Sequence, residues 1–325
     1  MRFRPRTLIA VLTVAIAAAL LGTAPAATAG QVGHPHQHGR NDVYIMDDDS
    51  PLDTGDTPSP GDIYHSPDIW VCDTPVICPS PGVNPIAGQD NYVVVQLHEY
   101  GPGPVTGKLN LYYTNPSGGT IWPIDWIQFN SAALTVPGGG MLVELKWPKV
   151  PGPGHFCLLA RWVSAADPMT DPETPDTAFN TRWNNNIAWH NVDIVSLLVG
   201  KPDTRQFRLG NPLDGVSRSS LVITAPDKPF VGPGDLTVDL GPTLYERWKA
   251  NGAAGSGIEQ SGPTQLRIVD PRKASIDNLA LDPGEHATVT LTFLAEQPGA
   301  STVVVDQFDP NYGDLGGVRY DITVT

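Results

Sequence analysis

Hydrophobic and polar residues alternate with a period of two along much of this chain. In the run NYVVVQLHEYG, Val93, Val95 and Leu97 fall on one face of an extended backbone, while Gln96 and His98 fall on the other. The run ATVTLTF repeats the pattern, with threonines on its polar face. Such alternation is typical of β-strands that bury one face against a core and leave the other in water.

Turn-forming residues separate the alternating runs. Pro and Gly stand between them in stretches such as PGGG and VPGPG, and the chain contains 33 of each. About seven runs lie in the first half, a density typical of antiparallel sandwiches. A second set follows a short linker at Gly200–Thr204. The one helical candidate is PTLYERWKANG, with Pro242 near its start and Gly252 after its end.

These patterns predict an all-β protein with two Ig-like antiparallel β-sandwich domains in tandem. The first 29 residues have a basic start, a short apolar run at Leu8–Leu21 and small residues at Ala27–Ala29, as signal peptides do. We therefore expect a signal peptide at 1–29, a flexible His-rich arm at 30–41, a first sandwich at 42–198 and a second at 199–325. The protein is expected to be secreted and extracellular, with no membrane anchor.

The charge balance restricts the possible partners. A net charge of -14 disfavours nucleic acid and anionic membranes, and it is compatible with divalent cations.

Three cysteines follow the predicted signal peptide. In an oxidising compartment, Cys72 and Cys78 are expected to form a disulfide across the short loop CDTPVIC. Cys157 lies in an apolar strand, where a free thiol behaves as a small buried hydrophobe. Spacing alone leaves open a pairing of Cys157 with either of the others.

The run NTRWNNNIAWHNVDIV has two interpretations. Asparagines tolerate unusual backbone angles and bond to nearby backbone groups, so Asn184, Asn185 and Asn186 suit a corner before a strand. Alternatively, Trp183 and Trp189 could stack on a sugar ring, with Asn184 and Asn185 bonding to its hydroxyls. The structural interpretation is the stronger one, because core tryptophans are common in sandwiches.

Two segments are candidate metal sites. An acidic, Gly-containing stretch carries oxygen ligands of the kind that Ca²⁺ prefers, without the spacing of an EF-hand loop. Its carboxylates are Asp47, Asp48, Asp49, Asp53 and Asp56. In the HPHQH segment, His34, His36 and His38 share one side of an extended chain and could bind Zn²⁺ or Cu²⁺ weakly.

Catalytic patterns are missing from the sequence. It contains neither GxSxG nor HExxH, and its other histidines are isolated along the chain, a pattern more typical of structural or surface groups. Convergence of His98, His155 and His190 cannot be read from spacing. We therefore expect no enzyme activity.

Five segments of the first domain occur in a recognisable order. They are SPDIWV, GQDNYVVVQLHEYGPGPV, GTIWPIDW, GHFCLLARW and RWNNNIAWHNVDIV. Together, over about Asp42 to Leu197, they resemble a bacterial extracellular Ig-like module of the CARDB (cell-adhesion-related) type. His98–Tyr100 and the CDTPVIC insertion depart from that pattern, which leaves the ligand undetermined. The second domain resembles Ig-like and fibronectin-like sandwiches only generically.

The resemblance implies extracellular binding, adhesion or domain spacing. The sequence therefore predicts a secreted, non-enzymatic binding or adhesion protein with a cell-wall, polysaccharide or protein partner. Two alternatives stay open: an exported metal-binding protein that uses the His-rich arm, and the non-catalytic accessory part of a secreted hydrolase.

Overall fold

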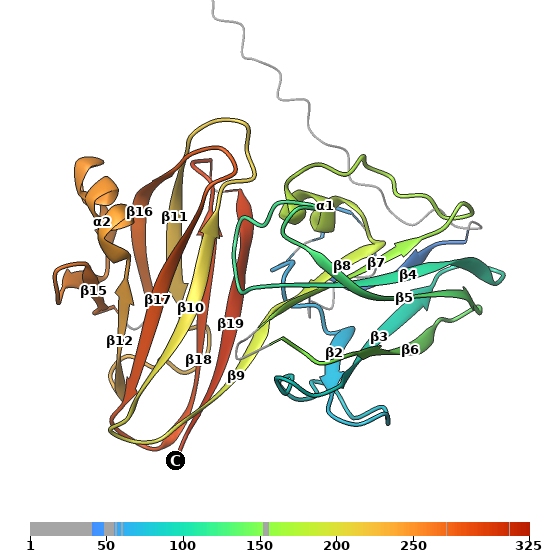
Figure 1. The fold of residues 1–325 in the computed structure, drawn as a ribbon, viewed down its shortest axis with the longest axis horizontal. Helices are drawn as coiled ribbons and strands as arrows, with labels where there is room; N and C mark the ends of the chain where they lie inside the picture. Colours follow the sequence, from blue (N-terminus) through green and yellow to red (C-terminus); the bar gives the residue numbers. More distant parts are fainter. Residues whose placement is uncertain are drawn as a thin grey trace, which may run out of the picture. The chain divides into compact units, whose positions relative to one another are not determined.

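Most of the expected strands are present in the computed structural model of the chain (Figure 1). The structure describes residues 41–48, 55, 57–59, 61–151, 156–270, 272–311 and 313–325. The strands gather into four sheets, which pair as two sandwiches, so the predicted all-β, Ig-like class is confirmed.

The first sandwich has two four-stranded sheets. In one sheet, the central strand β3 (Asn91–Glu99) pairs with β1 (Val43–Tyr44), β2 (Ile69–Cys72) and β6 (Met141–Trp147). The other has the order β5 (Ile127–Val136), β4 (Val105–Thr114), β7 (Cys157–Val163) and β8 (Ile187–His190). Val93, Val95 and Leu97 of β3 are all fully buried, as their alternation predicts.

The second sandwich has a five-stranded and a six-stranded sheet. The five-stranded order is β10 (Pro202–Gly210), β17 (His286–Ala295), β12 (Gly234–Asp239), β15 (Gln265–Ile268) and β14 (Ile258–Gln260). The six-stranded order is β13 (Gly255–Ser256), β16 (Lys273–Leu281), β11 (Ser217–Thr224), β18 (Gly299–Phe308), β19 (Asp314–Val324) and β9 (Val192–Leu197). Strands β9 and β10 therefore end the two sheets of this sandwich as edge strands.

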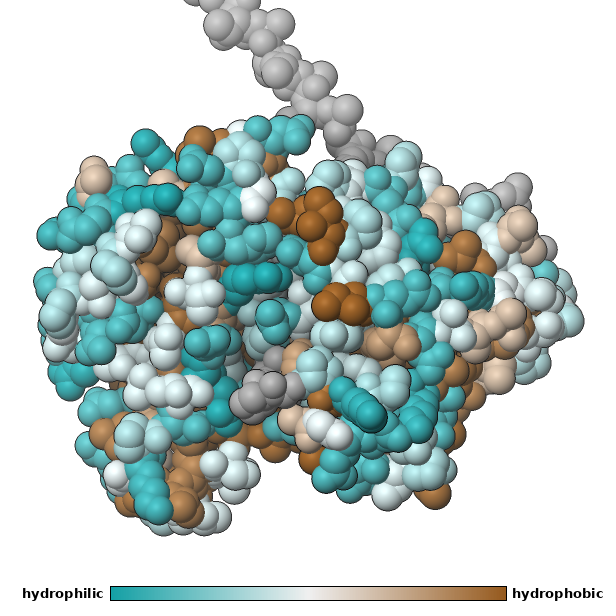
Figure 2. All heavy atoms as spheres, viewed as in Figure 1, coloured by the Kyte–Doolittle hydropathy of each residue, from teal (hydrophilic) through white to brown (hydrophobic). Residues whose placement is uncertain are grey.

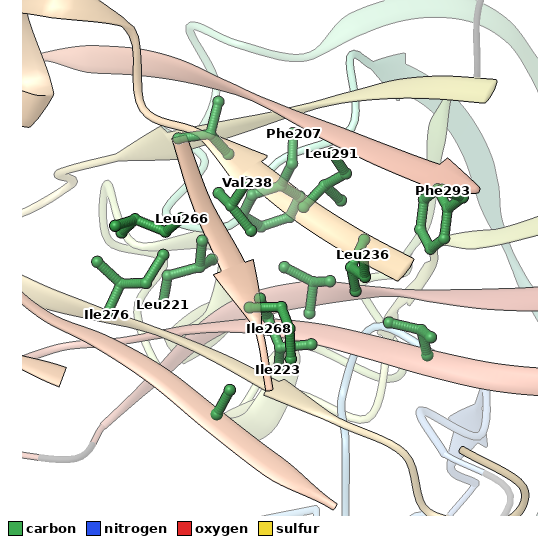
Figure 3. Packing of buried hydrophobic residues seen from close by; sticks show 14 of the residues in the cluster. Phe207, Leu221, Ile223, Leu236, Val238, Leu266, Ile268, Ile276, Leu291 and Phe293 are labelled. Atoms are coloured by element: carbon green, nitrogen blue, oxygen red, sulfur yellow. The ribbon is translucent and has the colours of Figure 1, made fainter. Parts of the chain in front are cut away.

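Each sandwich has its own hydrophobic core. Figure 3 shows the second, where Phe207 of β10 and Leu291 of β17 meet Leu221 and Ile223 of β11 from the facing sheet. These four side chains are 0 to 4% exposed, so they leave water almost completely on folding. On the face in Figure 2, hydrophobic residues lie scattered among hydrophilic ones. The apolar face of each alternating strand is thus buried in a core, as the sequence predicts.

The two helices differ in how far the sequence reveals them. Helix α2 (Gly241–Ala250) confirms the expected helical insertion, with Pro242 in its first turn. Helix α1 (Thr177–Trp183) was not predicted. Its one clear signal is Asp176, whose side chain accepts hydrogen bonds from the backbone N–H groups of Ala178 and Phe179, as an N-cap does.

The run IAWHNVDIV is two strands rather than the single last strand that its apolar pattern suggests. The chain leaves the first sandwich at Asn191, so that β8 pairs with β7 and β9 pairs with β19. The β9–β19 pair is parallel, whereas the prediction was antiparallel throughout. Parallel strands need a long connection, and strands β10 to β18 lie between β9 and β19 in the chain. The domain limits 42–198 and 199–325 stay predictions, although this pairing places β9 in a sheet of the second sandwich.

The cysteines are arranged as expected. Cys72 and Cys78 form a disulfide, and Cys157 is free and buried. Within the described residues, no helix is long and apolar enough to cross a membrane.

Candidate functional site

A groove of about 640 Å³ runs along the free edge of β10. The first sandwich supplies Asn84, Pro85, Asn115 and Pro116 to its lining. The second supplies Asp193 of β9, Tyr320 of β19, and Thr204, Arg205, Gln206 and Arg208 of β10. Both sandwiches are therefore needed to form it.

The backbone of β10 presents hydrogen-bonding groups to this groove. Just past the strand's end, Asn211 N donates to Glu285 O on the β17 side, at 3.0 Å. Arg208 N donates the other way, to Pro116 O at 2.9 Å. Because successive N–H groups of a strand point to opposite sides, Thr204 and Gln206 direct their N–H and C=O groups away from β17. These groups lie along the groove.

Pro202 agrees with this assignment. Pro202 is two residues before Thr204, so its backbone nitrogen also faces away from β17. Proline has no N–H group, and at this position no hydrogen bond to β17 is lost. Proline is tolerated in sheets at such edge positions. The sequence therefore carries one sign that this side of β10 is an edge.

Ion pairs fix the arginines of the groove. Arg205 lies 3.1 Å from Asp193 and 2.9 Å from Asp203, and Arg208 lies 3.5 Å from Asp125. Burial opposes ionisation of Asp125. Hydrogen bonds from His286 and the Ile121 N–H, together with Arg208, nevertheless hold the pKa of Asp125 below its usual value. The lining thus carries positive charges that carboxylates already compensate.

Tyr320 is one of the residues that line the groove. Its side chain is fully buried, and its hydroxyl makes no hydrogen bond among the described residues. Burial, with Asp193 nearby, raises the pKa of Tyr320 well above its usual value, so the hydroxyl keeps its proton. It is a buried donor and acceptor in the wall of an open groove.

Close backbone contacts hold the two walls together. The described residues of both sandwiches belong to a single compact unit. Gly119 has a φ of +56°, its N–H donates to Leu315 O at 2.6 Å, and a Cβ there would lie 2.2 Å from Gly210 O. The buried Tyr64 hydroxyl donates to Asp306 of β18. A larger residue at position 119 would force the walls apart.

The asparagine run forms the expected corner between α1 and β8. Asn184 Nδ2 donates to Asn180 O, and Asn185 Nδ2 donates to Asp42 Oδ1. Trp183 is 9% exposed and Trp189 is fully buried. Of the candidate sugar-binding residues, only Asn185 is partly exposed, so the two indole faces are not available for stacking in this structure.

The candidate metal ligands are only partly described. Asp47 and Asp48 are buried, and Asp47 accepts a hydrogen bond from Ser59. Asp49, Asp53, Asp56, His34, His36 and His38 lie outside the described residues. Among the residues that are described, no three His, Cys, Asp or Glu side chains gather as a metal site. Calcium at the acidic loop and Zn²⁺ or Cu²⁺ at the arm stay predictions.

The isolated histidines have local partners. His98 Nε2 lies 2.8 Å from Asp68 Oδ2, and its ring stacks on Tyr44. His190 Nδ1 lies 2.8 Å from Ser66 O. His155 lies outside the described residues.

Sequence reasoning did not find the groove residues Asn84, Arg205 and Arg208. The predicted linker Gly200–Thr204 includes the first residues of β10, because the clear alternation begins only at Gln206. Pro202 followed by alternating residues is the signal that could have placed this edge strand.

Comparison with known proteins identifies no family: no family model and no curated protein match the chain. Among solved structures, it is similar to red sea bream transglutaminase, with 13% identity and a TM-score of 0.20. That match covers 79% of this chain and 31% of the transglutaminase, so the chain spans about a third of that protein.

Two further solved structures match a smaller share of the chain. One is a complex of CaDoc0917 with CaCohA2, with 15% identity and a TM-score of 0.26, covering 42% of this chain and 98% of that one. The other is a PapD-like domain of human CEP192, with 10% identity and a TM-score of 0.21, covering 42% and 80%. Likenesses this distant carry no argument about activity or partners, and the fold class rests on the sheets themselves.

Proposed function

We propose that this chain is a secreted, non-enzymatic β-sandwich protein that binds an extracellular partner in the groove along β10. The observation that carries the proposal is the side of β10 that no other strand of the described chain pairs with, which lies in a groove formed by both sandwiches. Unpaired backbone groups at the edge of a sheet are a ready binding surface. The partner belongs to the cell-wall, polysaccharide or protein class.

The side chains of the groove suit binding. Amides of Asn115 and Gln206 and the hydroxyl of Thr204 offer donors and acceptors for a polar ligand. Arg205 is held by the carboxylates of Asp193 and Asp203, and Arg208 by that of Asp125, so both are ordered before a ligand arrives. Such preorganisation lowers the entropic cost of binding.

A binding screen with a blocked groove tests this proposal. The full-length chain is immobilised and exposed to cell-wall polysaccharides, peptidoglycan and a peptide-display library, in parallel with Thr204→Trp. The indole would fill the groove at an exposed position of β10. Thr323→Trp is the matched control, since Thr323 is an exposed strand threonine that does not line the groove.

The expected result is a ligand whose affinity falls about tenfold or more in Thr204→Trp, a loss of roughly 1.4 kcal/mol, and is unchanged in Thr323→Trp. Equal binding by both variants and the unsubstituted chain would overturn the proposal. Retention of no ligand of any of the three classes would also overturn it.

A further inference from the structure

We propose that the groove binds an extended, uncharged peptide segment, which adds to the β10 edge as an extra strand. This inference rests on the proposed function and names the class of partner. In strand addition, main-chain hydrogen bonds provide affinity and alternate side-chain pockets provide specificity.

The geometry of β10 supplies the main-chain partners. Thr204 and Gln206 present N–H groups to the groove, and Pro202 and Gln206 present carbonyl groups. The Thr204 carbonyl also points this way but already accepts a hydrogen bond from Arg205 Nη1 at 3.4 Å. The set spans the first five residues of the strand, because the next outward N–H, that of Arg208, already bonds to Pro116 O. A short extended peptide segment could form hydrogen bonds with this set of backbone groups.

The protein itself already uses this edge in the proposed way. Ser117 and Arg208 form a parallel β-bridge, so a segment of the first sandwich adds to β10 directly beyond the groove. The neighbouring edge strand β9 is covered similarly, since Asn84 Nδ2 donates to Ile194 O at 2.7 Å and Ile194 N donates to Asn84 Oδ1 at 3.1 Å. The groove therefore lies along the same edge of β10 that already pairs with an extended segment at Arg208.

The charges of the groove indicate an uncharged occupant. Arg205 faces Asp193 and Asp203, and Arg208 faces Asp125, so neither a basic nor an acidic side chain would find an uncompensated partner. A charge taken from water without such a partner is costly. Hydroxyl and amide side chains fit the lining instead.

A buried group indicates where one of those side chains lies. Alternate side chains of an added strand point to opposite faces, toward Thr204 and Gln206 or toward Tyr320. The Tyr320 hydroxyl is buried in the groove wall and makes no hydrogen bond within the described chain. Because that hydroxyl has no exposed surface, a serine, threonine, asparagine or glutamine of the ligand would reach it only by displacing the side chains that cover it.

Two variants at one position separate backbone from side-chain recognition. A display library of uncharged peptides is selected on the full-length chain, and the peptides that compete for the groove are measured against Thr204→Pro and Thr204→Ala. Proline removes the outward N–H without breaking the ladder to β17, as Pro202 does two residues earlier. We expect about a tenfold or larger loss of affinity for Thr204→Pro and a smaller loss for Thr204→Ala, which removes the side-chain hydroxyl but keeps the backbone N–H.

N-methylation of the selected peptide, one residue at a time, provides the second measurement. Strand addition predicts loss of binding with a period of two, because only alternate peptide N–H groups face β10. Equal effects of Thr204→Pro and Thr204→Ala, or an N-methyl profile without that period, would overturn strand addition and leave the groove as a binding site. Binding of a polysaccharide but no peptide would do the same, whereas binding of neither would overturn the proposed function as well.

Discussion

Asn84 and Ile194 are joined by two hydrogen bonds in which the side chain of one residue replaces the backbone of a strand. Asn84 Nδ2 donates to Ile194 O, and Ile194 N donates to Asn84 Oδ1. Ile194 belongs to β9, whose other neighbour is β19, so the amide covers part of a sheet edge. One loop residue thereby connects the two sandwiches beside the groove.

Replacing Asn84 with leucine should remove both bonds, and also the bond from Asn84 Nδ2 to Asp193 Oδ1, while keeping the size of the side chain. We expect the free energy of unfolding, measured with urea, to fall by about 1–2 kcal/mol, since two backbone groups lose their partners. Asn115→Leu is the control, because Asn115 lines the same groove but is exposed. Equal losses in the two variants would show that the Asn84 bonds do not contribute.

The contact between the sandwiches depends on Gly119. Gly119→Ala should cost about 3 kcal/mol or more, because alanine would combine a left-handed backbone with a Cβ placed 2.2 Å from Gly210 O. Gly284→Ala isolates the backbone component, since Gly284 has a φ of +71° but a Cβ there would meet no atom of the described chain within 4 Å. Its cost should be about 1–2 kcal/mol. Similar melting temperatures for the two variants would contradict the close contact.

Buried carboxyl groups should make the protein more stable in mild acid than at neutral pH. Burial raises the pKa of Asp167 to about 6, although Val43 N and Asn186 Nδ2 both donate to the carboxyl group. Burial also raises the pKa values of Asp176 and Asp314 to about 6. The folded chain then binds protons that the unfolded chain has lost above about pH 4, so the free energy of unfolding falls as pH rises through about 6.

Asp167→Asn tests this pH dependence. The amide keeps an acceptor for the two donors but has no proton to lose, so the decrease in unfolding free energy between about pH 5 and pH 7.5 should shrink by about 1 kcal/mol. Asp214→Asn is the control at an exposed position. A pH profile unchanged in Asp167→Asn would show that Asp167 does not titrate in this window.

Cys157 should be unreactive in the folded protein. It is fully buried, burial raises its pKa to about 12, and its thiol donates to Asn115 O at 3.4 Å. Because the thiolate is the reactive form, a thiol reagent at neutral pH should modify no cysteine until denaturant is added, and then one per chain. Rapid modification of the native protein would contradict this placement.

The period-two pattern was sufficient to predict the strands whose two faces differ strongly in burial. In β17, Val289, Leu291 and Phe293 are all fully buried and alternate with more exposed threonines. The sequence does not predict strand β5, because most of its residues are at least partly exposed on both faces, as the neighbours Asn130 and Ser131 are, so its sequence does not alternate. Burial on one face is what makes a strand visible in a sequence.

The candidate site could not be predicted in the same way. Its hydrogen-bonding groups are backbone atoms of Thr204 and Gln206, which every residue except proline carries, so side-chain identity gives no direct sign of them. The groove also depends on Asn84 and Asn115, which lie far from β10 in the sequence and approach it only in the folded chain. Trp183 and Trp189, which the sequence offers as candidate sugar-binding residues, are buried because indoles are large and mostly apolar.

Amide hydrogen exchange in the free protein tests the open edge of β10 most directly. The N–H groups of Arg205 and Phe207 face β17 and should exchange slowly, whereas those of Thr204 and Gln206 face the groove and should exchange rapidly. Alternation of slow and rapid exchange along Thr204–Phe207 is the predicted result. Equal protection of all four amides would show that the edge is already paired and would contradict the account.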